Sequence, residues 1–355
     1  MDAHADHGLT VVVPVHNGAR TLPDTLESLR LQTAPLHEVI VIDDGSTDES
    51  VRIARSHPVA ARVIELGPHR GAAFARNTGL LEARTERVAF LDQDDLWLPA
   101  RAERVLAVFA AHPDLQVLVT GERVFAVAED RADLTAGGHP FAEWVTWWPA
   151  ADRVIAEMTD LPADAEPELT WVRTSRVLSG SLTVTTSYVL PRTLSLQVGG
   201  FATWARSADD WVLLQSLAAH TPIGSIADRS VLYRVHPTNT SVTTRWPRTL
   251  LTLAAAMRHG GALVPADHER DAASVGPLIG TNLLPHYLYA LAEEPGGRSA
   301  ADTWALWQLL ATQDDRTLRN LTRLARVQVR ARLPEPLVSR TRRLLRGPRS
   351  DRVEA

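Results

Sequence analysis

Three aspartates directly follow the apolar run Val88–Leu91 in the stretch RVAFLDQDDLWLP. Asp92, Asp94 and Asp95 lie within four positions, and carboxylates this close repel one another unless a positive charge offsets them. Carboxylate oxygens are the hard ligands that Mg²⁺ and Mn²⁺ prefer. The pattern predicts a divalent-metal site at Asp92 and Asp94, or alternatively a group of acids that caps a following helix. We interpret Asp95 as the cap of that helix.

The segment around these aspartates alternates apolar strands with helices. The runs Leu9–Val15 and Val39–Ile42 are continuously apolar and rich in β-branched residues, which is typical of strands covered on both faces. One helix is expected to follow the N-cap Thr21, a second to be capped near Ser46, and a third to surround Ala72–Leu81 before the strand VAFLD. This alternation predicts an α/β fold with a mainly parallel sheet.

Polar residues gather where these predicted strands end. His16 and Asn17 follow the first strand, Asp43 and Asp44 the second, and Asp92 the third. Parallel sheets bind ligands beyond the carboxyl ends of their strands, so this coincidence predicts a binding site at that edge. Asp44 precedes a glycine, and we interpret it as a turn residue.

The later part of the chain carries further candidates. The helix predicted for ADDWVLLQSLAAH begins with Asp209 and Asp210, which are either reactive carboxylates or acids favoured by the helix dipole. The strand predicted for SVLYRVHPTNTS is followed by His236, either a ligand or a structural histidine. The tryptophans of WVTWWP are core residues by default, with sugar stacking as the alternative; they are Trp144, Trp147 and Trp148.

Composition excludes several kinds of protein. The 355 residues contain no cysteine, which rules out disulfides, thiolate metal sites and a cysteine nucleophile. Every basic residue is arginine, so a lysine Schiff base and the lysine of a phosphate-binding loop are also excluded. No G-x-G-x-x-G follows the first strand, which argues against a NAD-dependent dehydrogenase. A nucleotidyltransferase would need a glycine-rich phosphate loop and a lysine, and both are missing.

Charge is distributed unevenly along the chain. The formal net charge is −5, yet the residues from Arg316 onward carry twelve arginines against three acids. This basic, amphipathic tail is expected to pack on the acidic remainder or on a second subunit, with contact to anionic lipid as the alternative. A basic face confined to one tail argues against nucleic-acid binding. No segment is apolar enough to span a membrane, so we expect a cytoplasmic protein, peripheral at the inner membrane face if the tail binds lipid.

Four motifs occur in a fixed order: VVVPVHNGARTL, VIDDGSTDES, RGAAFARNTGL with VAFLDQDDLWLP, and VGGF with ADDW. Together they resemble an inverting glycosyltransferase of family 2, with the GT-A fold of nucleotide-sugar transferases. The resemblance covers residues 9–245. It divides the chain into a disordered tail over 1–8, a GT-A domain over 9–245, and a helical carboxyl-terminal region over 246–355.

The resemblance implies a role for each matching residue. Asp94 is the metal ligand, assisted by Asp92 and His236, and Asp210 is the general base, with Asp209 beside it. The residues implied in binding the nucleotide sugar are Pro14, His16, Asn17, Asp43, Gly71, Arg76, Asp92 and Gly200. The family often has tyrosine where this chain has His16, and glutamate where it has Asp209.

The implied activity is metal-dependent transfer of a sugar from a nucleoside-diphosphate donor, with Mn²⁺ or Mg²⁺ as cofactor. A UDP-sugar is the expected donor, and the acceptor is a hydroxyl of a saccharide, a lipid-linked molecule or a small molecule. A homodimer is compatible with the basic tail. The alternative is a catalytically degenerate subunit that binds nucleotide sugars or serves as a scaffold, against which the retained acids Asp43, Asp92, Asp94 and Asp210 argue.

Overall fold

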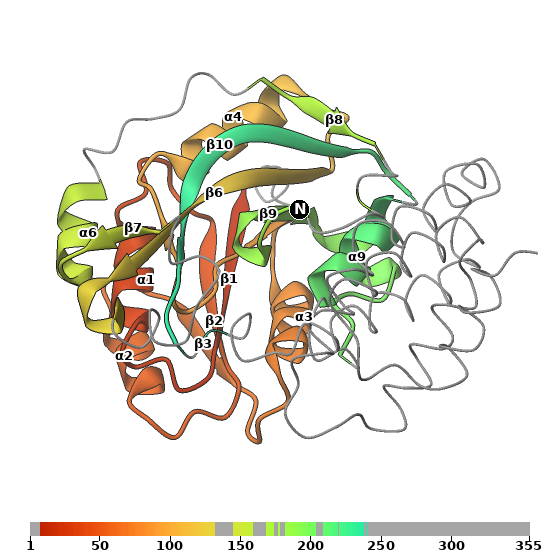
Figure 1. Ribbon diagram of the computed structural model, residues 1–355. Coiled ribbons are helices and arrows are strands. Elements are labelled where there is room, and N and C mark those ends of the chain that lie inside the picture. Colours follow the sequence, from red (N-terminus) through yellow and green to blue (C-terminus); the bar gives the residue numbers. More distant parts are fainter. Residues whose placement is uncertain are drawn as a thin grey trace, which may run out of the picture. The chain divides into compact units, whose positions relative to one another are not determined.

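The computed structural model describes residues 8–131, 145–158, 168–173, 177, 182–203, 209–218, 220–237 and 239. The chain divides into two units, residues 1–243 and 244–355, and all described residues belong to the first (Figure 1). The predictions for the helical region 246–355 with its basic tail lie outside the described residues, as do residues 1–7 of the expected amino-terminal tail and Trp144. Among the described helices, none is long and apolar enough to cross a bilayer.

One mixed sheet forms the centre of the described unit, in the order β3-β2-β1-β4-β9-β6-β10-β5. Its first half is parallel and consists of β1 (Leu9–Val15), β2 (Glu38–Asp43), β3 (Arg62–Glu65) and β4 (Arg87–Phe90). The predicted α/β fold with a mainly parallel sheet is therefore confirmed. β3 was not predicted, because RVIE is a short, partly exposed edge strand without a continuous apolar run.

The second half of the sheet mixes directions. β9 (Tyr188–Pro191) lies antiparallel between β4 and β6 (Val117–Val127), and β6 pairs in parallel with β10 (Ile223–Arg234). Three short strands complete the pairing: β5 (Leu96–Trp97) and β8 (Thr170–Val172) on β10, and β7 (Thr146–Trp148) on β6. The insertion of β9 brings residues near 185 beside the end of β4.

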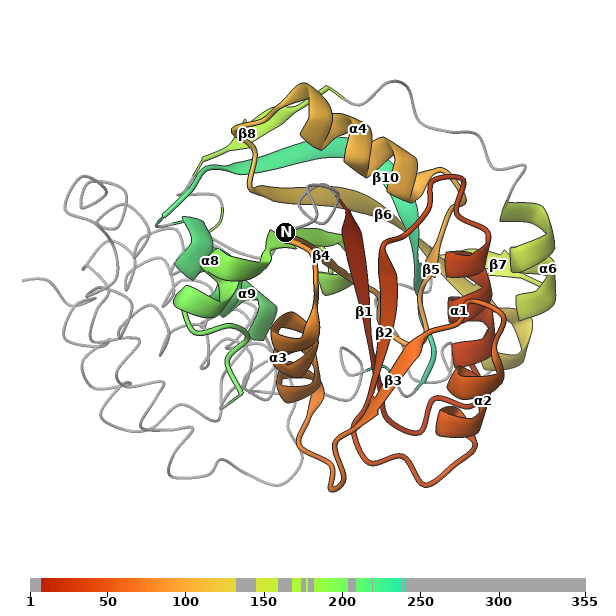
Figure 2. The same cartoon turned by 180° about the vertical axis from the view of Figure 1, so that it is seen from behind.

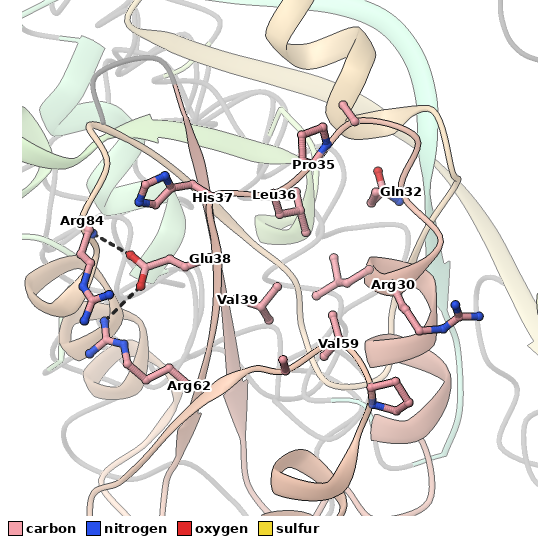
Figure 3. Close-up of a pocket in the computed structure, with 14 residues that line it drawn as sticks. Arg30, Gln32, Pro35, Leu36, His37, Glu38, Val39, Val59, Arg62 and Arg84 are labelled. Carbon is pink, nitrogen blue, oxygen red and sulfur yellow. Dashed lines mark hydrogen bonds and ion pairs between the residues drawn. The ribbon is translucent and has the colours of Figure 1, made fainter. Parts of the chain in front are cut away.

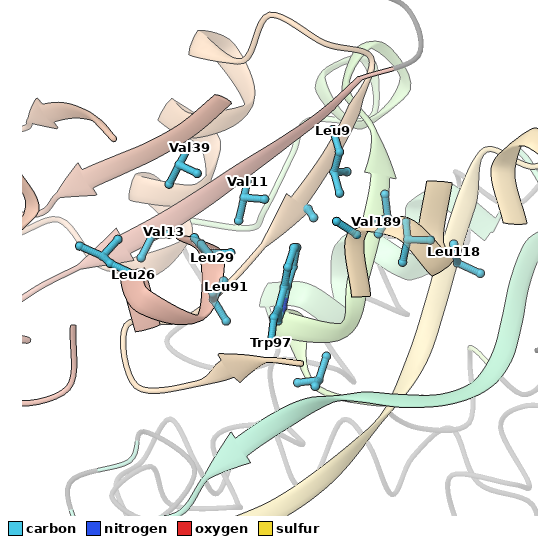
Figure 4. Packing of buried hydrophobic residues seen from close by; sticks show 14 of the residues in the cluster. Leu9, Val11, Val13, Leu26, Leu29, Val39, Leu91, Trp97, Leu118 and Val189 are labelled. Carbon is cyan, nitrogen blue, oxygen red and sulfur yellow. The ribbon is translucent and has the colours of Figure 1, made fainter. Parts of the chain in front are cut away.

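Helices cover both faces of the parallel half, as Figure 2 shows. Val11 and Val13 point to a core shared with α1 (Leu22–Arg30), α2 (Ser50–Ser56) and α4 (Arg101–Ala111), in which Trp97 is fully buried (Figure 4). Val12 points the other way, to a core shared with α3 (Ala72–Glu82) and α9 (Asp209–Ala218). Because successive strand side chains alternate between faces, a strand covered on both sides must be continuously apolar.

Shorter helical elements connect the later strands. They are the 3₁₀ turn η1 (Ala128–Asp130), α6 (Ala151–Glu157), the 3₁₀ turn η3 (Thr185–Ser187) and α8 (Arg192–Gln197). Of the apolar and β-branched segment SLTVTTSYVL, only the end belongs to β9. The turn η3 precedes it, where two buried threonines bond to other parts of the molecule.

Two predicted helix caps are wrong. α2 begins at Ser50 and not near Ser46, because Asp48 accepts hydrogen bonds from the N–H and hydroxyl of Ser50 and so defines the turn before the helix. α4 has Ala100 at its N-cap and no side-chain cap. Asp95, predicted to cap that helix, is instead completely buried in the loop between β4 and β5.

Candidate active site

The predicted site residues lie at the carboxyl edge of the parallel strands. Pro14 is within β1 and pairs with Ile42, while His16 and Asn17 follow the strand directly. Asp43 ends β2, and Asp92 and Asp94 follow β4. The sheet order β2-β1-β4 therefore brings these three loops side by side.

Arg76 connects two groups of acids that are far apart in the sequence. Its side chain extends from α3, is almost fully buried, and donates from Nη2 to Asp92 Oδ1 at 2.7 Å. Its Nη1 donates to Asp209 Oδ2 at 3.1 Å. The resemblance implied contact with base or phosphate; in the structure this guanidinium joins the Asp92 loop to the first turn of α9.

Asp94 and His236 form the candidate metal pair. Asp94 Oδ2 lies 2.8 Å from His236 Nε2, and the backbone N–H of His236 donates to Asn239 Oδ1. No group of three or more metal-ligating side chains occurs among the described residues. Mg²⁺ and Mn²⁺ commonly use one or two protein ligands together with waters and substrate phosphates, so an oxygen and a nitrogen donor at this distance fit such an ion.

Asp210 is the candidate base. Its Oδ2 accepts a hydrogen bond from Thr185 Oγ1 at 3.0 Å, and its Oδ1 accepts one from the Trp211 N–H at 2.9 Å. Burial and, to a smaller degree, the neighbouring Asp209 raise the pKa of Asp210 to about 6, although Arg76 and Thr185 oppose the shift. Burial also raises the pKa of Asp209, against the opposing charge of Arg76. Asp210 can therefore exchange a proton near neutral pH.

Asp95 has a role that the sequence did not reveal. Its Oδ2 accepts from Thr186 Oγ1 at 2.6 Å, and its Oδ1 accepts from the Arg234 N–H at 2.9 Å. Burial, followed by the charges of Asp94 and Asp92, raises the pKa of Asp95 well above its usual value. Asp95 thus fixes the Asp92–Asp95 loop to η3 and to the end of β10, two residues before His236.

The candidate nucleoside end of the site centres on Asp43. This residue is 3% exposed; its Oδ2 accepts from the Ser46 N–H at 3.1 Å, while its buried Oδ1 has no hydrogen-bond partner among the described residues. Asn17 has a φ of 51° and accepts from the Thr47 N–H at 2.8 Å, which ties the loops after β1 and β2 together. A buried acceptor without a partner fits an N–H or hydroxyl of a ligand.

Asp44 does more than form a turn, which corrects its interpretation. Its carboxylate accepts from the N–H groups of Arg70 at 2.8 Å and Gly71 at 2.7 Å, and lies 2.8 Å from His69 Nδ1. Gly71, with a φ of 96°, is the N-cap of α3. The rings of His69 and His16 lie 4.0 Å apart between centroids. The spacing of residues in the sequence did not indicate that His69 would lie beside Asp44 and His16.

Gly200 lies against α3. Its φ is 67°, and a Cβ at this position would lie 2.3 Å from Asn77 Oδ1. That same oxygen accepts from the Phe201 N–H at 2.7 Å, while Asn77 Nδ2 donates to the Phe201 carbonyl at 2.8 Å. Only glycine fits this approach, so the VGGF turn is held next to the helix that carries Arg76.

The described tryptophans of WVTWWP are packing residues. Trp148 packs against a buried cluster that includes Leu96, and Trp147 packs against a second cluster that includes Val235. The guanidinium carbon of Arg131 lies 5.1 Å from the centre of the Trp147 ring system. These contacts agree with the core interpretation of both residues.

A pocket of about 470 Å³ lies at the opposite edge of the sheet (Figure 3). It is lined by residues at the amino ends of β2 and β3, among them Leu36, Glu38 and Arg62. Glu38 accepts from the Arg84 N–H at 2.7 Å and from Arg62 Nη2 at 3.4 Å. None of the candidate site residues lines this pocket.

Comparisons with known proteins show what this chain is similar to in sequence and in fold. Residues 10–149 match the model of the family described as glycosyl transferase family 2. A Haemophilus influenzae protein described as an uncharacterized glycosyltransferase is 36% identical over 110 residues, which cover 31% of this chain and 37% of that protein. The match thus spans little more than a third of that relative.

Solved structures share the fold. Staphylococcus aureus TarS 1–349, in complex with UDP-GlcNAc, has a TM-score of 0.57 at 17% identity, covering 88% of this chain and 83% of that one. The mannosyltransferase PcManGT from Pyrobaculum calidifontis, in complex with GDP-Man and Mn²⁺, has a TM-score of 0.52 at 21% identity, covering 96% and 86%. The described unit has their GT-A fold, and residues 10–149 of this chain are similar to glycosyl transferase family 2.

Proposed function

We propose that this protein transfers a sugar from a nucleoside-diphosphate donor to an acceptor hydroxyl, with inversion at the anomeric carbon and with the help of Mn²⁺ or Mg²⁺. One observation carries the proposal: the Arg76 guanidinium bridges Asp92 and Asp209 at the carboxyl edge of the sheet. This bridge joins the loop expected to hold the donor diphosphate to the helix turn expected to activate the acceptor. Transfer requires both the loop that holds the donor and the helix turn that activates the acceptor.

The donor is a UDP-sugar in our proposal. The free Oδ1 of Asp43 is suited to accept from a base N–H or a ribose hydroxyl, and His16 and Asn17 lie on the adjoining loop. TarS was solved with UDP-GlcNAc, whereas PcManGT was solved with GDP-Man, so both bases occur on this fold. Gly71 and Gly200 contribute backbone near the donor.

Asp94 and His236 would hold the metal, with Asp92 assisting from the same loop. When bound, a divalent cation neutralises charge on the departing diphosphate. Arg76 adds a fixed positive charge beside Asp92, which moderates the repulsion among the acids before the donor arrives. The loop itself is held in place through Asp95.

Asp210 is the base in our proposal, and Asp209 is a supporting residue. Asp209 Oδ2 is already occupied by the ion pair with Arg76 at 3.1 Å, and the positive charge of Arg76 opposes the rise in the pKa of Asp209 that burial causes. The Asp210 carboxylate takes the proton of the acceptor hydroxyl as that oxygen bonds to the anomeric carbon. The bond from this carbon to the donor phosphate oxygen breaks, the nucleoside diphosphate leaves, and the proton passes from Asp210 to solvent.

The remaining assignments concern the acceptor and the rest of the chain. We propose a hydroxyl acceptor on a saccharide, a lipid-linked molecule or a small molecule, bound on the Asp210 side of the site. Residues 9–245 would form the transferase domain, and residues 246–355 an appended region. Its basic tail would dock on the acidic transferase domain or on a second copy, in preference to lipid.

A donor screen tests the proposal on the full-length protein. Thermal shift with UDP, GDP and their sugars, each with and without Mn²⁺, should show metal-dependent stabilisation by one nucleotide family; a ligand at a hundred times its Kd adds about 2.7 kcal/mol. Hydrolysis of the same radiolabelled donor should then require metal. Binding without turnover in the presence of candidate acceptors would favour a degenerate subunit. If the protein neither binds a nucleotide nor turns over a nucleotide sugar, the proposal is overturned.

A further inference from the structure

Two adjacent threonines direct their hydroxyls to the two halves of the candidate active site. In the turn η3, Thr185 Oγ1 donates to Asp210 Oδ2 at 3.0 Å. Thr186 Oγ1 donates to Asp95 Oδ2 at 2.6 Å and accepts from the Asp92 N–H at 3.3 Å. One short turn therefore contacts both the proposed base and the loop that carries Asp92 and Asp94.

Burial and several hydrogen bonds hold the turn η3 in place. Thr186 is fully buried and Thr185 is 7% exposed. The Thr186 carbonyl accepts from Arg101 Nη2 at 3.4 Å, and Arg101 Nη1 donates to Thr120 Oγ1 at 2.8 Å and Ser230 Oγ at 3.2 Å. Arg101 thus connects η3 to β6 and β10. A turn fixed by several elements can set the position of the groups it contacts.

The pairing of β9 determines where the turn η3 lies. η3 leads into β9, which pairs antiparallel with both β4 and β6. The carboxyl end of β4 carries the Asp92–Asp95 loop, so the start of β9 must lie next to that loop. Asp210 approaches the same turn from α9, whose side chains Leu213 and Leu217 pack in the core on this face of the sheet.

We propose that Thr185 and Thr186 are positioning residues that hold the general base and the metal-binding loop in fixed relation to each other. Thr185 orients the Asp210 carboxylate and favours its ionised form, while Thr186 anchors the loop through Asp95 and the Asp92 N–H. The inference rests on the proposed function, because it assigns the two hydroxyls to the same site. The two adjacent threonines thus have different roles, one at the general base and one at the metal-binding loop.

Matched substitutions separate the two roles. Valine replaces threonine with nearly the same shape but without the hydroxyl. Thr185→Val should lower kcat by roughly 10-fold to 100-fold, the effect of one hydrogen bond to a charged group, with the donor KM nearly unchanged. The acid limb of its pH–rate profile should move to higher pH, because a donor to the ionised carboxylate is lost. Thr185→Ser should restore most of the rate.

Thr186→Val should give a different result. Its main effect should be a higher donor KM and a higher metal requirement, with the acid limb unchanged. Calorimetric titration with UDP and Mn²⁺ should show weaker binding by Thr186→Val and normal binding by Thr185→Val, a measurement that needs no turnover. If Thr186→Val does not fold, Thr186→Ala removes the same hydroxyl with a smaller side chain and serves for the loop, and the Thr185 pair alone decides the base.

Thr193→Val is the control, because Thr193 Oγ1 also donates to a carboxylate, Glu86 Oε2 at 2.7 Å, but on the exposed surface. It should leave every parameter unchanged. If Thr185→Val and Thr186→Val behave like this control, or lose kcat and stability in the same proportion, the inference is overturned while the proposed function stands. A wild-type protein that neither binds nor transfers would overturn both.

Discussion

Arg76 Nη1 lies 3.1 Å from Asp209 Oδ2, although 133 residues separate the two in the chain. The same guanidinium reaches Asp92, and it is 7% exposed. This contact gives the two neighbouring acids of α9 different environments, since Asp209 is paired with a permanent positive charge and Asp210 is bonded to a threonine hydroxyl. Their environments therefore predict different roles.

The first prediction compares the two acids. Asp210→Asn should keep the fold and the donor affinity but lower transfer by about 10²-fold or more, because the amide cannot accept the proton. Asp209→Asn should lower it less, since Asp209 acts through Arg76. Single-turnover rates with saturating donor, together with UDP binding, provide the measurement. The reverse ranking would transfer the base role to Asp209.

The second prediction concerns pH. The Asp210 carboxylate must be ionised to accept a proton, and its pKa is raised to about 6. Lowering the pH through that value protonates it, so kcat/KM should fall with a midpoint near 6 and by about tenfold per unit below it. Arg76→Gln should move the midpoint upward, because the positive charge that opposes the shift is removed. A midpoint near 4 in the unchanged protein would contradict the assignment.

The third prediction concerns the metal. Asp94→Ala should abolish turnover and remove most of the Mn²⁺ dependence of UDP binding, and His236→Ala should raise the Mn²⁺ concentration needed for half-maximal rate. Asp94 Oδ2 and His236 Nε2 lie 2.8 Å apart, so under our proposal one ion would contact both. Metal titrations after EDTA treatment measure these effects. Glu103→Gln is the control, because Glu103 lies on α4 outside the candidate site and accepts a hydrogen bond from Thr33 at 2.7 Å. Full activity in EDTA would rule out the metal.

The fourth prediction tests the contact between α3 and β1. A Cβ on Gly79 would lie 2.2 Å from Val12 Cγ1, and Val12 is fully buried. Gly79→Ala should therefore lower the free energy of unfolding by about 1–3 kcal/mol, despite the higher helix propensity of alanine. Urea unfolding measures it. Leu81→Ala, at a 62% exposed position of the same helix, should change stability by only about 0.5 kcal/mol. If both substitutions change the free energy of unfolding by the same amount, α3 can move away from β1 and the prediction is wrong.

The sequence by itself determined the local parts of this protein. Apolar runs long enough to be covered on both faces predicted β1 and β2, and the polar residues after them lie at the carboxyl edge of the sheet. Motif order was sufficient to indicate the resemblance to glycosyl transferase family 2, because each motif is contiguous in the chain. The acids of α9 and the Asp92–Asp95 loop could be named for the same reason.

The tertiary structure decided how these parts meet. Asp95 is a buried anchor and not a helix cap, since Thr186 and the Arg234 N–H reach it from other elements. Asp44 holds the loop before α3 and does not merely form a turn. Such contacts depend on strands that are far apart in the sequence and pair in the sheet, above all on the antiparallel insertion of β9. The periodicity of one segment does not indicate which distant hydroxyl or guanidinium will contact that segment.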